Sequence, residues 1–216
     1  MKDLGNRSTY WDGAGAAKTF THPVHHGWLA EVSAHARIFD QGCGYGRVMA
    51  ELSDHGYSDV SGVDPSVALI ERGRTLRPGL RLSVLESPPH LACAPAAFDA
   101  VLLFAVLTCI PDNEDQQALV TELNRDLAPG GLLDVSDLLL QHDERNRDRH
   151  AAHDALHPPP RTGSSPRRTA QFCRHHDITH LHALLSGFDL LKERTVEVAT
   201  MNAHRSQAVQ LLTRKR

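Results

Sequence analysis

The chain has 216 residues, with 23 Lys and Arg against 26 Asp and Glu, and a formal net charge of −3. This length suits one domain with a sizeable core, and the charge balance argues against a dedicated nucleic-acid-binding protein, which usually carries a strongly basic face. No apolar stretch reaches the roughly 18 residues that span a bilayer, and residues 1–5 lack the apolar core of a signal peptide. We therefore expect a cytoplasmic protein that acts on a small molecule, with neither a nucleic-acid nor a membrane partner.

The N-terminal residues predict a covering segment and a helix. Residues 1–21 are polar and carry two adjacent aromatic residues, Tyr10 and Trp11, followed by Asp12, which suits a flap. Residues 23–35 place Trp28, Leu29 and Val32 at helical spacing and predict a helix. We expect residues 1–35 to form this flap and helix, and residues 36–216 to form the main domain.

A glycine-rich segment follows the first predicted strand at residues 37–40. The glycines fall at 42, 44 and 46, and Asp64 ends the next predicted strand. A strand, a glycine loop and an acidic residue about 20 positions later are typical of a nucleoside site at the carboxyl edge of a parallel sheet. Gly42 and Gly44 can take positive φ and let backbone amides approach a ligand, while Asp40 and Asp64 are placed to accept hydrogen bonds.

Strand and helix patterns alternate along the rest of the chain, which predicts a doubly wound α/β sheet. We expect Val67, Ile70 and Leu76 to face inward from the helix over 65–76. The last two strands read as an antiparallel hairpin. The predicted helices cover residues 46–55, 65–76, 114–127 and 178–185, and the predicted strands cover 60–64, 80–85, 99–104, 132–138, 190–200 and 207–212.

The pattern Asp40-x-Gly-x-Gly-x-Gly46, with Asp64 and a Pro129-Gly-Gly turn further on, resembles the class I S-adenosylmethionine-dependent methyltransferases over residues 36–140. The resemblance implies a Rossmann-like seven-stranded sheet with an antiparallel final strand, helices on both faces, and S-adenosyl-L-methionine as cofactor. It also implies that the loop cups the methionine end, that Asp64 holds the ribose hydroxyls, and that Glu86 and Ser87 lie near the adenine. The candidate cofactor residues are Tyr10, Lys18, Asp40, Gly42, Cys43, Gly44, Gly46, Asp64, Pro65, Glu86, Ser87 and Phe104.

Methyl transfer needs alignment, exclusion of water and, for some acceptors, removal of a proton. The ring of Tyr10 can face the sulfonium of the cofactor, although a ring that only packs the flap onto the domain would account for this residue equally well. His22, His175 and His176 are candidate bases, with solvated or hydrogen-bonded histidine as the alternative. Asp137 and Asn146 can position an acceptor amine, and Asp137 can equally cap a helix. These six residues, Tyr10, His22, Asp137, Asn146, His175 and His176, are the candidate catalytic residues.

The 15 histidines and four cysteines suggest no metal centre. His176 and His180 share a helical face, but no third ligand or H-E-x-x-H pattern accompanies them. Cys43, Cys93, Cys109 and Cys173 contain no C-x-x-C pair, so we expect reduced thiols. Cys43 most simply packs within the glycine loop.

Residues 141–176 combine arginines with Pro158-Pro-Pro160, which cannot continue a helix. We expect a helix to about residue 155 and then a loop, and the resemblance implies a substrate lid at 141–176. The arginines of residues 161–174 can steer an anionic substrate toward the site, or can simply be solvated.

The predicted function is methyl transfer to O or N of a small-molecule acceptor that can be anionic. One alternative keeps the cofactor but transfers or cyclises its aminocarboxypropyl arm, releasing methylthioadenosine. A second alternative is an inactive cofactor-binding partner subunit. The sequence is compatible with a homodimer, although no exposed apolar stripe defines one.

Overall fold

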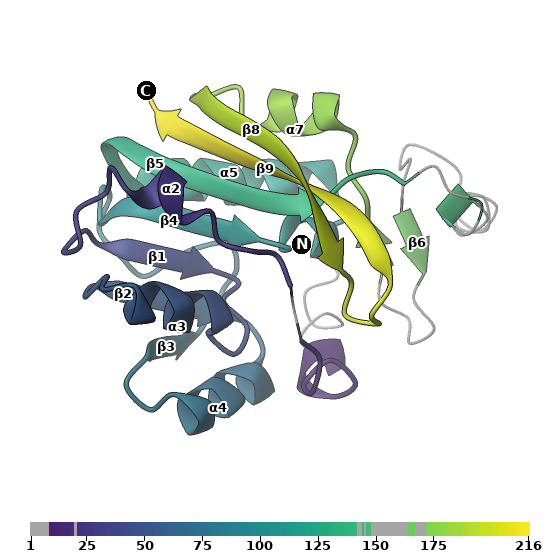
Figure 1. The fold of residues 1–216 in the computed structure, drawn as a ribbon, viewed down its shortest axis with the longest axis horizontal. Helices are drawn as coiled ribbons and strands as arrows, with labels where there is room; N and C mark the ends of the chain where they lie inside the picture. Colours follow the sequence, from purple (N-terminus) through teal and green to yellow (C-terminus); the bar gives the residue numbers. More distant parts are fainter. Residues whose placement is uncertain (1–8, 20, 142–143, 145, 148–163, 167–171) are drawn as a thin grey trace.

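The structure, a computed structural model, describes residues 9–19, 21–141, 144, 146–147, 164–166 and 172–216. Its main feature is a seven-stranded sheet in the order β3-β2-β1-β4-β5-β9-β8 (Figure 1). The first five strands are parallel, and β9 pairs antiparallel with both β5 and β8. This confirms the predicted fold class. The strands are β1 Ile38–Gln41, β2 Val60–Asp64, β3 Arg81–Val84, β4 Phe98–Phe104, β5 Leu127–Leu138, β8 Phe188–Ala199 and β9 Arg205–Lys215.

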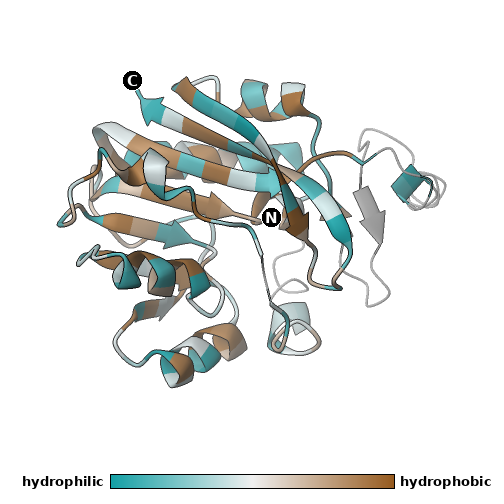
Figure 2. Ribbon diagram, in the orientation of Figure 1, coloured by the Kyte–Doolittle hydropathy of each residue, from teal (hydrophilic) through white to brown (hydrophobic). Residues whose placement is uncertain are grey.

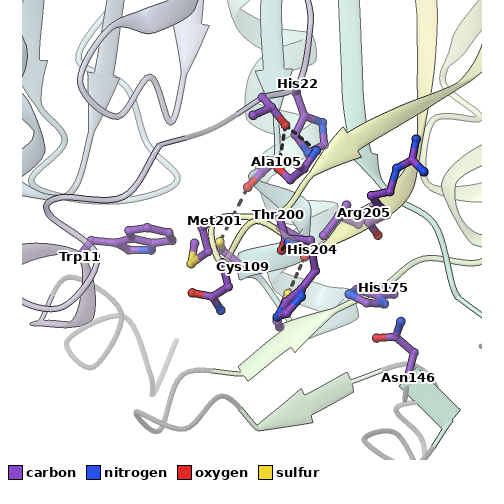
Figure 3. Close-up of a pocket in the computed structure, with 17 residues that line it drawn as sticks. Trp11, His22, Ala105, Cys109, Asn146, His175, Thr200, Met201, His204 and Arg205 are labelled. Carbon is purple, nitrogen blue, oxygen red and sulfur yellow. Dashed lines mark hydrogen bonds between the residues drawn. The ribbon is translucent and has the colours of Figure 1, made fainter. Parts of the chain in front are cut away.

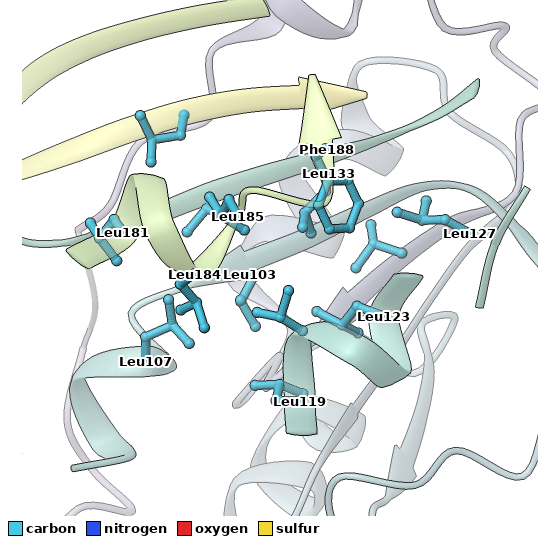
Figure 4. Close-up of a cluster of buried hydrophobic side chains, with 14 of the residues drawn as sticks. Leu103, Leu107, Leu119, Leu123, Leu127, Leu133, Leu181, Leu184, Leu185 and Phe188 are labelled. Carbon is cyan, nitrogen blue, oxygen red and sulfur yellow. The ribbon is translucent and has the colours of Figure 1, made fainter. Parts of the chain in front are cut away.

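Helices cover both faces of the sheet, because successive residues of a buried strand point to opposite sides. Ile38 belongs to an apolar cluster with residues of three helices, and its neighbour Phe39 belongs to a second cluster with residues of two others. The first three are α2 His26–Leu29, α3 Arg47–Asp54 and α4 Val67–Leu76, and the other two are α5 Asn113–Asp126 and α7 Ile178–Leu184. Figure 4 shows the second cluster, where leucines of α5 and α7 meet the sheet. Hydrophobic residues recur along the central strands (Figure 2).

The carboxyl ends of β1, β2 and β4 lie at one edge of the sheet. Asp40 of β1 is level with Gly62 of β2 and Leu102 of β4, so the segments that follow these strands emerge together. Strand order reverses between β1 and β4, and ligands of open α/β sheets bind at such a reversal. The fold therefore brings the glycine loop, Asp64 and Phe104 to one place.

Two local predictions were wrong. The helix predicted over 23–35 is only the four residues of α2, since His25 caps it after Pro23 and turns follow Leu29. In α4, Val67 and Leu76 are 51% and 57% exposed instead of facing inward. The buried face contains Gly73, where an added Cβ would lie 2.7 Å from the carbonyl oxygen of Tyr45. This close approach sets the rotation of the helix.

The segment expected to form a lid is described only in part. Within it, β6 Ser164–Pro166 pairs antiparallel with β7 Phe172–Arg174 where a loop was expected. Residues 142–143, 145, 148–163 and 167–171 lie outside the described residues, and so does most of the helix expected to about residue 155. The lid stays a prediction.

No helix in the described part of the chain is both long enough and apolar enough to cross a membrane.

Candidate functional site

The glycine loop between β1 and α3 has a backbone that only glycine adopts easily. Gly42, Gly44 and Gly46 have φ of 73°, 56° and 79°, in the left-handed region. A Cβ on Gly42 would lie 2.5 Å from Cγ2 of Val106, which is closer than real side chains approach. The loop is therefore a cradle that any side chain at Gly42 would fill.

Asp64, at the end of β2, ties this loop to the start of α4. Its Oδ2 accepts a hydrogen bond from the Gly44 amide at 3.0 Å, and its Oδ1 accepts one from the Ser66 amide at 2.8 Å. Burial raises the pKa of Asp64 to about 6, and the two amide donors oppose that rise. Near neutral pH the carboxylate is mostly ionised, so it remains an acceptor beside the loop.

Asp40 is 2% exposed, and its Oδ2 finds no hydrogen-bond partner among the described residues. Burial raises the pKa of Asp40 to about 7, with Arg47 opposing the shift and Asp64 adding to it. A buried carboxylate oxygen without a partner is costly, so it marks a place where a ligand donor is missing.

These residues line a cavity that we call the loop cavity. Cys43 lies in its wall, and burial raises the pKa of this thiol well above its usual value, which makes it a poor nucleophile. The loop cavity is lined by Trp11, His22, Asp40, Gly42, Cys43, Gly44, Arg47, Val48, Asp64, Pro65, Leu69, Phe104, Ala105, Val106 and Cys109.

A second cavity adjoins it and is walled by the turn between β8 and β9; we call it the hairpin cavity (Figure 3). It also contains Asn146 and His175, which are 9% and 6% exposed. The residues that line both cavities are Trp11, His22, Ala105 and Cys109, and we call them the shared wall. Two molecules bound side by side would therefore meet at these residues.

His22 is the ionisable residue of the shared wall that is most deeply buried, at 5% exposure. Its Nδ1 lies 2.8 Å from Oγ of Ser136, and its carbonyl oxygen accepts a hydrogen bond from Arg47. Burial, and then the charge of Arg47, lower the pKa of His22 to about 4. The imidazole is therefore neutral near pH 7.

The flap residues predicted to touch cofactor support the cavities from outside. The Tyr10 hydroxyl donates to Sδ of Met201 at 3.4 Å, and the Lys18 ammonium donates to Oδ1 of Asn202 at 3.0 Å. The ring that lines both cavities is that of Trp11, which packs edge-on against Tyr10 with the ring centroids 5.0 Å apart. The predicted roles of Tyr10 and Lys18 stay predictions.

Asp12 joins the flap to the cofactor side of the fold, which the sequence did not indicate. Its Oδ1 accepts hydrogen bonds from the Ser66 hydroxyl at 2.7 Å and from the Ala68 amide at 3.0 Å. Arg72 of α4 also donates to the carbonyl oxygens of Ala16 and Lys18. The same Ser66 thus contacts Asp64 through its amide and Asp12 through its hydroxyl.

Asp137 and His176 lie behind the hairpin cavity and do not line it. Strand alternation points Ser136 toward His22 and Asp137 toward the opposite face, where its Oδ2 accepts from the Thr108 amide at 3.1 Å. Burial raises the pKa of Asp137 to about 8 and lowers the pKa of His176 to about 3. Their 3.7 Å contact therefore joins two neutral groups near pH 7 and is not an ion pair.

Three other predicted residues also line neither cavity: Gly46, whose added Cβ would meet Leu80 and Leu82, and Glu86 and Ser87. Glu86 and Ser87 are exposed after β3 and line neither cavity. Their predicted place near the adenine stays a prediction. Arg174, which borders the arginine-rich segment, is buried and donates to the carbonyl oxygen of Pro111 at 3.1 Å. This arginine therefore secures the start of α5.

Sequence reasoning missed the turn that walls the hairpin cavity. Thr200, Met201, Asn202, His204 and Arg205 all line it. A usable signal existed, because an antiparallel final strand must begin at the carboxyl edge of its parallel neighbour. Leu138, the last residue of β5, pairs with Ala208 near the start of β9, so the preceding turn lies at the site.

Fold and cavities together define an α/β protein that binds a nucleoside at the carboxyl edge of its sheet, beside room for a second molecule. Residues 39–135 match the family described as methyltransferase domain. A solved S-adenosylmethionine-dependent methyltransferase from Methanosarcina mazei shares 25% identity and a TM-score of 0.81, over 90% of this chain and 97% of that one. Both matches support a class I S-adenosylmethionine-dependent methyltransferase: one covers the residues from β1 to β5, and the other covers the fold of nearly the whole chain.

Two further similarities bear on function. Carboxy-S-adenosyl-L-methionine synthase from Shewanella loihica is 31% identical over 124 residues, which are 52% of this chain and 49% of that protein. The chain thus matches about half the length of this curated relative. The Burkholderia thailandensis 1,6-didemethyltoxoflavin-N1-methyltransferase, solved with 1,6-didemethyltoxoflavin and S-adenosylhomocysteine, has a TM-score of 0.68 at 18% identity, covering 99% of this chain and 85% of that one. At this identity the likeness shows the fold.

The family uses S-adenosylmethionine, and the loop cavity fits this cofactor. The unpartnered Oδ2 of Asp40 suits the amino group of the methionine end, and the space at Gly42 admits a ligand where a Cβ would clash. Asp64 offers acceptor oxygens to hydroxyl groups. Asp40, the glycine loop, Asp64 and Phe104 are the residues that would hold it.

Proposed function

We propose that the protein is an S-adenosylmethionine-dependent methyltransferase that acts on O or N of a small-molecule acceptor. The observation that carries this proposal is the shared wall, which joins the loop cavity to the hairpin cavity through Trp11, His22, Ala105 and Cys109. A cofactor in the first cavity and an acceptor in the second would meet without crossing solvent, as an in-line displacement requires.

The bound cofactor supplies a methyl group activated by a sulfonium. Held by Asp40, the glycine loop, Asp64 and Phe104, it would offer the methyl carbon to the acceptor lone pair, with sulfur keeping the electron pair of the broken bond as a thioether. Trp11 excludes water from the shared wall, and its ring face suits a nearby positive charge. His22, neutral near pH 7, takes the proton of an acceptor that must lose one.

A small acceptor is also supported by the Burkholderia enzyme of the same fold, whose name describes methylation of one nitrogen of a small heterocycle. The similarity to the Shewanella protein favours a second candidate, in which the chain converts the cofactor itself to a carboxylated derivative. The nucleoside product distinguishes the candidates.

The test is to incubate the purified chain with S-adenosylmethionine, alone and with a panel of small hydroxy, amino and carboxy compounds, and to identify nucleosides by mass spectrometry. S-adenosylhomocysteine that forms only with an acceptor supports the proposal. Carboxy-S-adenosylmethionine in its place supports the second candidate. Methylthioadenosine formed without any acceptor contradicts the proposal and favours loss or cyclisation of the aminocarboxypropyl arm. Tight binding of S-adenosylhomocysteine by calorimetry, with no turnover of any compound, favours an inactive partner subunit.

A further inference from the structure

The hairpin cavity has an unusual balance of charge. Its lining includes His22, His175, His204 and Arg205, and within the described part of the chain no Asp or Glu lines it. An ammonium group placed there would meet basic or neutral side chains on every described side. The lining therefore disfavours a cationic acceptor through the absence of a counter-charge.

Two carboxyl groups close to residues of the lining do not enter the cavity. Asp137 lies behind the cavity, and its raised pKa of about 8 leaves it protonated near pH 7. Glu197 pairs with Arg205 at 3.2 Å, but their side chains are 87% (Arg205) and 69% (Glu197) exposed, so this pair lies in solvent and is weak. In Figure 3 the guanidinium of Arg205 points outward from the labelled cluster. Arg205 and Glu197 thus form an exposed pair outside the buried part of the cavity, where His22 and His175 lie.

Two buried donors define the part of the cavity away from the glycine loop. Asn146 and His175 line the hairpin cavity but not the loop cavity, and both are at least nine-tenths buried. They come from segments nearly thirty residues apart, line the same cavity, and are both drawn on the side of the view away from Trp11 (Figure 3). An amide NH2 and an imidazole N–H are donors that suit a carboxylate, whose oxygens only accept hydrogen bonds.

The basicity of His22 points the same way. Because the pKa of His22 is lowered to about 4, this imidazole is a weak base at the shared wall. A weak base serves poorly an acceptor that must first lose a proton from an ammonium group.

We propose that the hairpin cavity binds a small acceptor through a carboxylate, which Asn146 and His175 receive while the rest of the molecule extends to the shared wall. The site discriminates against ammonium compounds of the same shape. This inference rests on the proposed function and narrows its substrate class from any small molecule to carboxylates.

The experiment uses three probes of similar shape: benzoate, benzamide and benzylamine. Each is titrated by ligand-observed NMR into the full chain saturated with S-adenosylhomocysteine. Benzoate should bind at least about tenfold more tightly than either of the others, which corresponds to about 1.4 kcal/mol. Benzylamine binding as tightly as benzoate, or no benzoate binding at millimolar concentration, would overturn the proposal.

Asn146→Asp is the sharpest variant, because it keeps the side-chain shape and places a carboxylate where the structure has a donor. Benzoate affinity should fall at least about tenfold and benzylamine affinity should rise. Asn124→Asp, the same change on α5 away from both cavities, is the control and should leave both affinities unchanged. His175→Gln keeps a donor and should weaken benzoate binding less than Asn146→Asp does.

Folding and the proposed function are checked separately. Calorimetric affinity for S-adenosylhomocysteine should be the same in Asn146→Asp as in the parent chain, which reports an intact loop cavity. If the parent chain does not bind S-adenosylhomocysteine, the proposed function fails, and the same titrations without it still decide whether the cavity prefers carboxylates. Unchanged benzoate affinity in Asn146→Asp contradicts the assignment of Asn146.

Discussion

Two requirements coincide at Gly42. Its φ of 73° disfavours any residue with a Cβ, and that Cβ would also lie 2.5 Å from Val106. Gly130 has the same φ of 73°, but an added Cβ there meets no described atom within 4 Å. A side chain at Gly130 would therefore cause backbone strain alone, whereas a side chain at Gly42 would cause the same strain and also a clash with Val106.

We predict that Gly42→Ala lowers the affinity for S-adenosylhomocysteine at least about tenfold, because the added methyl displaces Val106 in the wall of the cavity. Gly130→Ala should cost about 1–2 kcal/mol of stability through its left-handed backbone but leave the affinity unchanged. Calorimetry and urea unfolding measure the two quantities. Equal affinities in the two variants would contradict the claim that the ligand needs the space at Gly42.

Asp137 gives a pH-dependent prediction. Its pKa is about 8 in the folded protein and has an ordinary value of 3.8, so the folded state binds the extra proton between these values. Stability from the protonated group is complete below about pH 4 and is lost as the pH rises toward about 8. Asn at this position cannot titrate.

The free energy of unfolding of the parent chain minus that of Asp137→Asn should therefore fall by about 1 kcal/mol per pH unit between about pH 5 and about pH 8. Urea unfolding at three pH values in this range measures the difference. Asp99→Asn is the control, since Arg37 lowers the pKa of Asp99 and its contribution is lost only at acidic pH. A flat difference for Asp137→Asn would show that the carboxyl is ionised.

Among the elements, the flap depends most on contacts between distant parts of the chain. Asp12 attaches it to the N-terminus of α4, while Thr21 exchanges two 2.7 Å hydrogen bonds with the backbone of Ala199. Trp11 directly precedes Asp12 and lies in the shared wall. Release of either attachment should therefore expose the Trp11 ring.

Asp12→Ala should increase quenching of Trp11 fluorescence by acrylamide and weaken S-adenosylhomocysteine binding several-fold, because the flap loses its hold on Ser66. The measurement uses a Trp28→Phe background, since the chain has two tryptophans. Asp112→Ala is the matched control: Asp112 caps α5 through the Glu114 amide, and its loss should cost about 1 kcal/mol without changing Trp11. Equal quenching in the two variants would show that Asp12 does not hold the flap against the domain.

The sequence predicted those elements whose signal is local. The glycine spacing, Asp64 and the apolar runs specify the loop and the parallel strands, because each pattern is read within a few residues. It was harder to predict which residues of a single helix or strand face the core. In α4 the approach of Gly73 to Tyr45 turns Val67 outward, and in β5 one residue of phase sends Asp137 away from the cavity while Ser136 meets His22.

The hairpin cavity could not be predicted from such patterns. Its wall depends on contacts such as that of Tyr10 with Met201, which lie 191 residues apart. Trp11, Met201 and His175 come from three separate segments and meet only when β9 is inserted beside β5. No local pattern carries that information, since the partners are chosen by the topology of the whole sheet.

At the scale of the whole molecule, the two apolar clusters share their strands. Val101 and Leu133 belong to one cluster, while their neighbours Leu102 and Leu132 belong to the other. Unfolding of either helical layer would expose residues of β4 and β5. The other layer packs on the same two strands, so it would lose its support. We therefore expect one cooperative transition for both faces.

The last prediction tests this coupling through the ligand. A ligand at 100 times its dissociation constant stabilises the native state by about 2.7 kcal/mol, which is roughly 5–10 °C for a domain of this size. Leu133→Ala and Met49→Ala remove fully buried side chains from opposite faces and should each cost about 2–5 kcal/mol. Neither position lines the loop cavity, so each variant at ligand saturation should regain the same increment as the parent chain. Leu190→Ala, at a site 49% exposed, should change stability by less than about 0.5 kcal/mol. Calorimetric traces with two transitions, only one of them shifted by ligand, would show that the faces unfold separately.

A single shifted transition would mean that a ligand bound at one edge of the sheet stabilises both cores. The reason is that the strands that hold the glycine loop are also the strands that both helical layers cover.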